Sequence, residues 1–363
     1  TASLCDAVTE GSNSQVLLDQ LEGANLFLVP LDHRREWYRY HRLFADFLRT
    51  ELEPERQATL HLRAACWFER QALWPEAVKH ALASGDVAEG ARMVRLAAQE
   101  TFRQAAFLIL QGWLDALPDE VVRGDAELAT YQGFILFMTG APAEAGRYAE
   151  AAGRSLAPDA DRSSRGRLLS LQAHVALARD ELEAAIQCSR EALDELGRDE
   201  YLFRSLTANI LGQTLEWQGD VSAAADAYRQ GALTGRQAGD QLGSLAAQVN
   251  LAFALNELGH RREAVALCQQ VAGGTALPAG RVSPQVEGIC VAWSWLSYEG
   301  NELDQAGEQA VRALEFSKRV NFADAVLRMQ SILAQVRLAA GDLEEARQVI
   351  QEGLQYADRL GMR

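Results

Sequence analysis

The feature that most constrains the fold is a column of glycines spaced about 40 residues apart, each followed five or six residues later by a small residue. The column contains Gly140, Gly219, Gly259, Gly300 and Gly341, with Arg179 in the one vacant position. The small residues are Ala145, Ala184, Ala224, Ala264, Ala306 and Ala346. A fixed period of this length is typical of stacked helical hairpins. Because such solenoids present long concave surfaces, the period favours binding over catalysis.

Residues 206–228 show how one repeat is built: a helix, a turn and a second helix. Gly219 can take the left-handed conformation that ends the first helix, and Asp220 can then cap the second. A small residue seven positions before the turn would let the paired helices approach closely, with a larger residue such as Tyr228 opposite. These small residues are Gly133, Gly212, Ala252 and Ala334. The same helix-starting signal is found at Gly341–Asp342 with Glu345, at Asp180 with Glu183 and at Asp86 with Glu89.

The repeat resembles the tetratricopeptide repeat (TPR), whose Leu-Gly and Ala positions are matched by Leu211, Gly212 and Ala224. The family period is 34 residues, so a spacing near 40 implies longer helices. The expected fold is therefore all-α, a TPR-like right-handed superhelix of antiparallel helical hairpins.

Bulk composition narrows the function. The net charge of −15 disfavours binding to a nucleic-acid backbone. No apolar run is long enough to cross a membrane, so we expect no membrane partner. The five cysteines include no CxxC pair, which disfavours zinc sites and disulfides and indicates a cytoplasmic protein. The chain starts at Thr1 with no secretion signal, so we expect it to begin inside a longer protein.

The segments outside the repeats also have assignable structure. Helices are expected over residues 60–71, 75–83, 86–100 and 102–117, and a long loop over residues 273–284. Near the N-terminus a helix over 15–22 is followed by β-type runs at 25–31 and 36–40, a polar turn at 32–35 between them, and a helix from about His41. Helix, hairpin, helix is a small winged-helix pattern. Its basic and acidic residues are equal in number, so we do not expect this segment to bind DNA.

The amino-acid sequence of residues 22–48, with the stretch that follows to Gly85, resembles that of the MalT-like large ATP-dependent LuxR-type transcriptional regulators. These regulators belong to the signal-transducing (STAND) NTPase class. The resemblance implies a winged-helix domain over 1–56, a helical connector over 57–117 and a TPR-like superhelical sensor domain over 118–363. It also implies partners: the NTPase domain of the same protein, a small-molecule inducer or regulatory protein, and self-association on activation.

Two parts of such a regulator are not expected in this chain. A phosphate-binding P-loop needs glycine directly before its lysine, but Lys79 follows Val78 and Lys318 follows Ser317. A single hairpin follows Gly341, which leaves no room for a DNA-reading domain. We therefore predict that this piece neither hydrolyses ATP nor binds DNA directly, and holds no cofactor itself, with ATP or ADP bound by the full-length protein.

His41 begins the run His41, Leu43, Asp46, Phe47, Leu48, which resembles the winged-helix signature HxLxxDFL of the wider STAND class. That resemblance implies that His41 contacts the β-phosphate of ADP in the full-length protein. A histidine at a helix N-terminus can donate a hydrogen bond to phosphate oxygens. The alternative interpretation is a capping or packing histidine.

No other residues form a recognisable reaction centre. His61, His80 and His174 lack the spacing of metal ligands, and no serine-nucleophile motif occurs. We therefore predict no catalytic residue, no metal site and no enzyme activity in this chain.

The superhelix groove is the remaining candidate site. In TPR folds the first helix of each hairpin lines the concave face, which predicts inward positions at Asn209, Gln213, Glu216, Asn256, Trp295 and Tyr298. Amides beside aromatic rings suit a sugar-like or other polar small ligand, or a peptide. The alternative is ordinary groove surface and packing. The favoured function is the signal-sensing, autoinhibitory and oligomerisation-controlling region of a bacterial transcriptional activator, and the alternative is a generic TPR scaffold for a protein partner.

Overall fold

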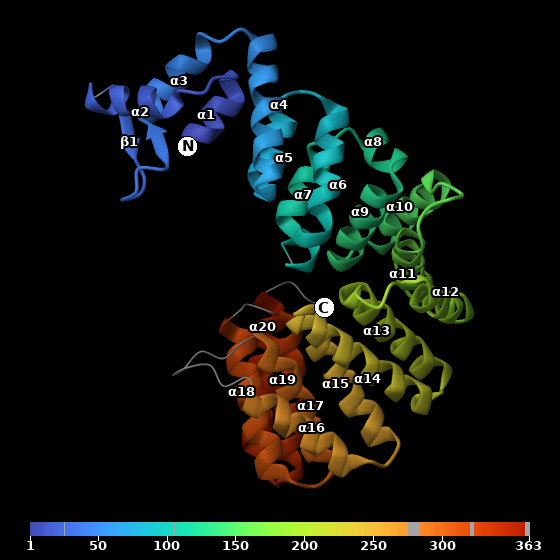
Figure 1. Ribbon diagram of the computed structural model, residues 1–363. Helices are drawn as coiled ribbons and strands as arrows, with labels where there is room; N and C mark the ends of the chain where they lie inside the picture. The colour runs from blue at the N-terminus through green and yellow to red at the C-terminus, as the bar shows by residue number, and fades with distance from the viewer. Residues whose placement is uncertain (25, 105, 275–283, 320–322, 360–363) are drawn as a thin grey trace. The chain divides into compact units, whose positions relative to one another are not determined.

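The computed structural model describes residues 1–24, 26–104, 106–274, 284–319 and 323–359. Within these residues the chain forms helices α1–α20 and one two-stranded sheet, as Figure 1 shows. Contacts divide it into two compact units, Thr1–Ala157 and Pro158–Arg363. Both predicted domain boundaries, at 56/57 and 117/118, fall inside the first unit. None of the helices in the described ranges combines the length and apolar character that a membrane span requires.

The N-terminal part of the first unit has the helix–hairpin–helix order expected from the sequence. Its elements are α1 (Ala2–Thr9), α2 (Ser14–Gly23), β1 (Leu28–Pro30), β2 (Tyr38–Tyr40) and α3 (Arg42–Thr50). The strands pair antiparallel, with Leu28 opposite Tyr40. Between them Asp32 accepts hydrogen bonds from the backbone N–H groups of Glu36 (3.1 Å) and Trp37 (2.8 Å), which hold the pKa of its carboxyl below the usual value. The hairpin prediction is confirmed for the described residues, although both strands are shorter than expected; helix α1 was not anticipated.

The rest of the first unit consists of seven helices. They are α4 (Pro54–Arg70), α5 (Trp74–Ala83), α6 (Val87–Arg103), α7 (Phe107–Asp115), α8 (Asp119–Gly124), α9 (Ala126–Met138) and α10 (Pro142–Ser155). The helix predicted over 102–117 is present as α7, but it starts at Phe107, five residues later than predicted. Phe102 belongs to α6 and is buried, with its ring 5.2 Å from Phe107 and 5.5 Å from Tyr131, and α7 is a separate helix. The predicted cap at Asp86 is confirmed, since its carboxylate accepts the N–H of Glu89 at 3.0 Å.

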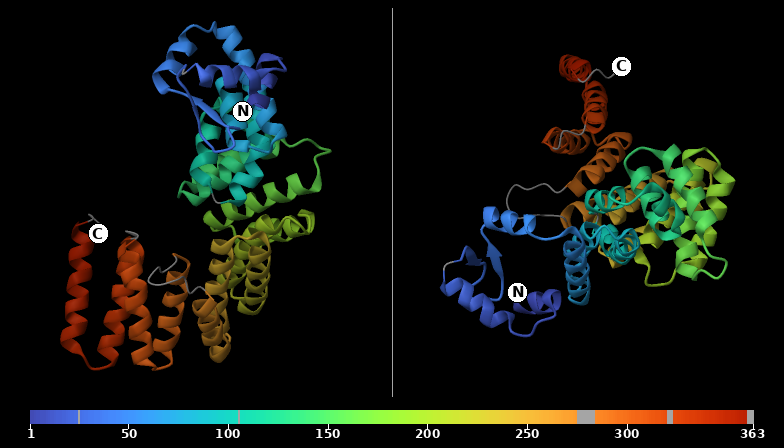
Figure 2. Two further views of the ribbon diagram at one scale, coloured as in Figure 1. Left: turned by 60° about the vertical axis from the view of Figure 1, so that its left-hand side comes forward. Right: turned by 90° about the horizontal axis from the view of Figure 1, so that it is seen from above.

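The second unit is a stack of five helical hairpins. Its helices are α11 (Arg162–Ala178), α12 (Leu182–Glu195), α13 (Tyr201–Gln218), α14 (Val221–Ala238), α15 (Gln241–Glu257), α16 (Arg261–Gly274), α17 (Pro284–Glu299), α18 (Leu303–Arg319), α19 (Ala323–Ala339) and α20 (Leu343–Arg359). The odd-numbered helices contact one another in sequence and form an inner layer. Helices α12, α14, α16 and α18 each pack between two of them, and α20 packs against α19. The later hairpins stand side by side in Figure 2. Most of the loop predicted over 273–284 lies outside the described residues.

The turns show how the period is built. Gly140, Gly219, Gly259 and Gly341 are left-handed, with φ between 81° and 93°, as predicted for Gly219 and Gly341. In the two other repeats the left-handed residue is Asp180 (φ 63°) and Asn301 (φ 60°). The predicted positions Arg179 and Gly300 are therefore wrong by one residue. In every repeat a buried alanine follows the left-handed residue by five positions: Ala145, Ala185, Ala224, Ala264, Ala306 and Ala346. The predicted Ala184 is exposed.

These shifts have physical reasons. The count from turn to buried alanine is fixed by the geometry of the second helix, so the turn residue must move with the alanine. Asp180 is left-handed and cannot cap α12; Glu181 occupies that position, so the predicted Asp180 cap is wrong. Gly300 is not left-handed, and it lies beside the guanidinium of Arg261, whose Nε donates to the carbonyl of Leu296 at 3.1 Å.

The close approach of paired helices is confirmed at Gly212. A Cβ atom there would lie 2.5 Å from the ring of Tyr228, which is fully buried. The Tyr228 hydroxyl donates to Glu216 at 2.6 Å, and burial followed by this contact raises the pKa of the phenol. The predicted cap at Asp220 is also present, accepting the N–H of Ala223 at 3.1 Å.

Candidate functional site

The inner layer of the second unit contains a cavity of about 600 Å³ between helices α15, α17 and α19. Each helix contributes residues spaced three or four apart, so one face of each points inward. The lining residues are Val249, Asn250 and Phe253 from α15, Gly288, Val291 and Trp295 from α17, and Arg328, Ser331, Ile332 and Gln335 from α19. Three consecutive hairpins therefore build one site.

The lining follows the repeat. Counted back from each left-handed turn residue, Phe253, Trp295 and Gln335 lie six positions before it, and Val249, Val291 and Ser331 lie ten before it. The cavity is thus made by equivalent positions of successive repeats, as a solenoid groove requires. The same two positions on α13 are occupied by Gln213 and Asn209.

The surface of the cavity is mainly apolar. Val249, Phe253, Val291, Trp295 and Ile332 supply aliphatic and aromatic surface, and the Trp295 ring lies 5.8 Å from that of Tyr298. Its polar groups are Asn250, Arg328, Ser331 and Gln335.

The absence of a side chain at Gly288 lets α15 and α17 approach closely. A Cβ atom there would lie 3.3 Å from Val249 Cγ2. This contact brings the apolar walls of the cavity together.

The predicted groove residues divide by register. Trp295 lines the cavity, whereas Glu216, Asn256 and Tyr298, three positions before their turns, face neighbouring side chains instead. Glu216 holds the hydroxyl of Tyr228, and Asn256 Nδ2 donates to Glu299 Oε2 at 2.6 Å. The position three before the turn therefore lies on the packing side of the inner helix.

The remaining two predicted residues lie on α13, outside the cavity. Asn209 is buried, and its Nδ2 donates to the backbone oxygen of Gly243 at 3.3 Å. Gln213 is half-buried. The prediction missed Asn250, Phe253, Arg328 and Gln335, although counting back six residues from Gly259 and Gly341 would have reached Phe253 and Gln335.

A second cavity of about 630 Å³ lies on α19 and α20, at the last hairpin of the described chain. It shares Ser331 and Gln335 with the first cavity. Its apolar residues Leu338, Leu343 and Ile350 are 57%, 65% and 52% exposed, respectively. The two cavities therefore adjoin along α19.

His41 lies directly before α3, and its side chain is exposed. The backbone N–H of His41 donates to the backbone carbonyl of Phe27 at 2.7 Å. The backbone carbonyl of His41 accepts the N–H of Ala45 at 2.9 Å, which is the first hydrogen bond of α3. Its side chain lines a cavity of about 440 Å³ together with Arg39, Tyr40, Arg42 and residues of the first strand and α3. Two guanidinium groups therefore flank the predicted phosphate-contacting histidine.

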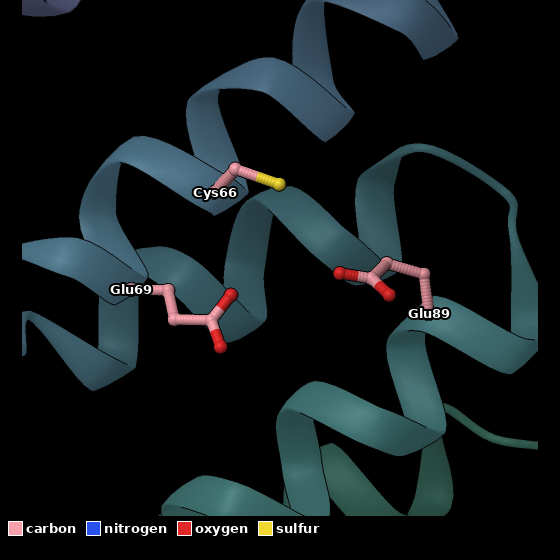
Figure 3. Close-up of side chains that lie close together, drawn as sticks. All are labelled: Cys66, Glu69 and Glu89. Atoms are coloured by element: carbon pink, nitrogen blue, oxygen red, sulfur yellow. The ribbon is translucent and has the colours of Figure 1, made fainter.

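Cys66, Glu69 and Glu89 bring possible metal-ligand atoms within 4.8 Å of one another (Figure 3). Arg92 already occupies both carboxylates. Its Nη1 and Nη2 donate to Glu69 at 2.9 and 2.7 Å, and its Nε donates to Glu89 at 2.8 Å. The hydrogen bonds to Arg92 lower the pKa of Glu69. This cluster is a salt bridge between α4 and α6.

Two histidines that lie 19 residues apart in sequence meet between α4 and α5. Their Nδ1 atoms, on His61 and His80, are 2.8 Å apart, and the His80 ring stacks on Phe68. Burial, and secondarily His61 and Lys79, lowers the pKa of His80 to about 4. The spacing rules used on the sequence could not find this pair, because its members lie on different helices.

Comparison with known proteins gives the family. Residues 1–60 match the MalT winged helix domain, and residues 166–361, more than half of the chain, match the MalT-like TPR region. The chain belongs to the MalT-like family. The HTH-type transcriptional regulator MalT of Cronobacter sakazakii is 26% identical over 355 residues, which cover 95% of this chain and 38% of that protein. The chain thus spans well under half the length of this MalT-like relative.

Solved structures share the fold. A STAND protein with a tetratricopeptide repeat sensor from Pyrococcus horikoshii superimposes with a TM-score of 0.73 at 14% identity, covering 98% of this chain and 54% of that one. The apo quorum sensor NprR of B. thuringiensis gives a TM-score of 0.53 at 13% identity, covering 80% of this chain and 77% of that one. Residues 1–60 therefore form a winged-helix region and residues 166–361 a MalT-like TPR region, and no catalytic domain is evident in the described residues.

Proposed function

We propose that this MalT-like chain is the signal-sensing part of a cytoplasmic STAND transcriptional regulator and that its inducer binds in the cavity between α15, α17 and α19. The observation that supports this proposal is the cavity itself. Every lining residue lies within the MalT-like TPR region, and a volume of about 600 Å³ is within the range of small-ligand sites. Helices from three hairpins line this cavity, so one bound ligand can change the arrangement of several repeats.

The proposed mechanism is differential binding. A ligand held by α15, α17 and α19 stabilises the arrangement of hairpins that contacts it best, and shifts the population toward that arrangement. In the full-length regulator this shift would release the NTPase domain for self-association, and the coupling is reciprocal, so self-association would tighten inducer binding. The resting state is autoinhibited because the ligand-free arrangement is favoured without inducer.

The test fills the cavity. Val291→Phe adds an aromatic ring to the α17 wall, and Leu338→Phe makes the matched addition on the wall of the adjoining cavity on α19–α20. In the full-length regulator, Val291→Phe should abolish the transcriptional response to inducer with the uninduced level and the melting temperature retained. Leu338→Phe should leave the response intact. An inducer response unchanged by Val291→Phe would contradict the proposal.

A second function, binding of a peptide or another extended partner segment, is favoured because the two cavities adjoin along Ser331 and Gln335. A Rap protein solved in complex with competence and sporulation factor shares the fold, with a TM-score of 0.53 at 9% identity over 80% of this chain. If a peptide or partner segment occupied both cavities here, Leu338→Phe would impair the response as strongly as Val291→Phe.

We further propose that His41 contacts a phosphate of ADP in the full-length regulator. Support comes from its place before α3 and from Arg39 and Arg42 in the same cavity, since anions bind favourably at helix N-termini among cations. His41→Ala should then speed ADP dissociation and raise uninduced activity without lowering the melting temperature. An unchanged ADP off-rate with a lower melting temperature would make His41 a structural residue.

A further inference from the structure

The charge and polarity of the cavity between α15, α17 and α19 restrict what can bind there. We infer that its ligand is a small molecule with an apolar, ring-containing body and one anionic group, and that Arg328 binds this anion. The inference rests on the proposed function and narrows it to a ligand class.

The body of the ligand must be apolar because the walls are. Phe253, Val291, Trp295 and Ile332 offer no charged group, and only Trp295 among them carries a polar atom. A carbohydrate carries a hydroxyl on nearly every carbon, and each hydroxyl left without a partner in the cavity would cost binding free energy. Burying an apolar ring against the same walls is favourable in proportion to the area removed from water. An aromatic or alicyclic body is therefore favoured over a sugar.

The anionic group of the ligand is inferred from the charges of the residues that line the cavity. Among the described residues that line the cavity, Arg328 carries the one formal charge, and no carboxylate is present. The Arg328 side chain is exposed, so an anionic group of a ligand in the cavity can reach its guanidinium. A guanidinium binds a carboxylate or sulfonate through two parallel N–H donors. Asn250, Ser331 and Gln335 lie in the same lining and can donate further hydrogen bonds to an anion.

The experiment compares two fluorescent probes with one body. 8-Anilinonaphthalene-1-sulfonate has an apolar aromatic body and one anionic group, and N-phenyl-1-naphthylamine has the same body without charge. Both are titrated into the purified 363-residue chain at low salt. We expect the anionic probe to bind more tightly. Arg328→Gln should weaken it about tenfold and leave the neutral probe within about twofold, because only the ionic contact is lost. Val291→Phe should remove the binding of both probes.

Arg347→Gln is the matched control, since Arg347 is an exposed cation that lines the adjoining cavity. It should leave both probes unaffected. The inference is overturned if Arg328→Gln weakens both probes equally, if Arg347→Gln rather than Arg328→Gln weakens the anionic probe, or if a neutral disaccharide or a peptide displaces the probe in preference to small aromatic carboxylates.

Failure of this inference can be told apart from failure of the proposed function. If Val291→Phe abolishes probe binding but leaves the inducer response of the full-length regulator unchanged, the cavity binds this ligand class and is not the sensor site. If Val291→Phe abolishes the response to an inducer that proves to be uncharged, the sensor site stands and the ligand class is wrong.

Discussion

Protonation of His174 should make the stability of the second unit depend on pH. His174 lies in α11, six positions before the left-handed Asp180, at the repeat position that Trp295 occupies in the cavity. It is buried, and its Nδ1–H donates to the carbonyl oxygen of Ser170 at 2.7 Å. Burial lowers its pKa from 6.5 to about 4. The folded state therefore resists a proton that the unfolded chain accepts readily.

The sign and size of the effect follow from linkage. Because the pKa of His174 is depressed in the folded state, its contribution to the free energy of unfolding is fully present above pH 6.5. Between pH 6.5 and 4 the unfolded chain binds a proton that the folded chain does not, so this stability is lost as the pH falls toward 4. A difference of about 2.5 pKa units corresponds to about 3 kcal/mol in all, of which about 2 kcal/mol is lost by pH 5.

The measurement is urea denaturation of the chain, followed by circular dichroism, at several pH values between 7.5 and 5. His174→Gln keeps an N–H donor and removes the titration, and glutamine occurs at this repeat position in Gln213 and Gln335. Relative to wild type, the variant should gain about 2 kcal/mol between pH 7.5 and 5. His260→Gln, which removes an exposed imidazole from the same unit, is the control.

The reasoning is refuted if the free-energy difference between wild type and His174→Gln stays constant over this pH range. A direct titration of the His174 ring by NMR gives an independent check. An observed pKa near 6.5 in the folded protein would show that its burial does not exclude the proton.

Two further predictions concern packing. Gly212→Ala should destabilise the second unit by about 1–3 kcal/mol, because the added methyl meets the buried ring of Tyr228. The next repeat has Ala252 and Cys268 at the equivalent positions, so adding Tyr228→Cys should offset part of this cost in a double-mutant cycle. Additive losses of stability would refute the contact. Leu314→Ala and Leu354→Ala truncate the same repeat position, which is 9% exposed in α18 and 61% exposed in α20. Urea denaturation should show a loss of about 2–4 kcal/mol for the first and under about 1 kcal/mol for the second, and equal losses would contradict the assigned burial.

Local geometry was readable from the sequence. A glycine ends a helix in the left-handed conformation, and an alanine five residues later packs where the hairpin closes, so a 40-residue column predicts stacked hairpins. The close contact at Gly212 and Tyr228 was predicted for the same reason, because both residues lie within one hairpin. The N-terminal hairpin was readable from its alternating and turn-forming residues.

Where glycine was replaced, the pattern misled by one residue. Asp180 and Asn301 take the left-handed conformation, which aspartate and asparagine tolerate better than most side chains, so the neighbouring Arg179 and Gly300 were wrongly placed in the column. The sequence alone could not separate a glycine that takes the left-handed conformation from Gly300, which does not.

The cavity and the side-chain clusters were decided by tertiary structure. Trp295, which the sequence predicted to face the groove, lines the cavity, but its neighbours Phe253 and Arg328 come from other hairpins. His61 meets His80 across two helices. The sequence by itself determined the repeat, the turns that end in glycine and the family, because these depend on residues close together in the chain. Which side chains from separate hairpins converge depends on the rotation between successive repeats, which no local pattern records, so only the tertiary structure could decide it.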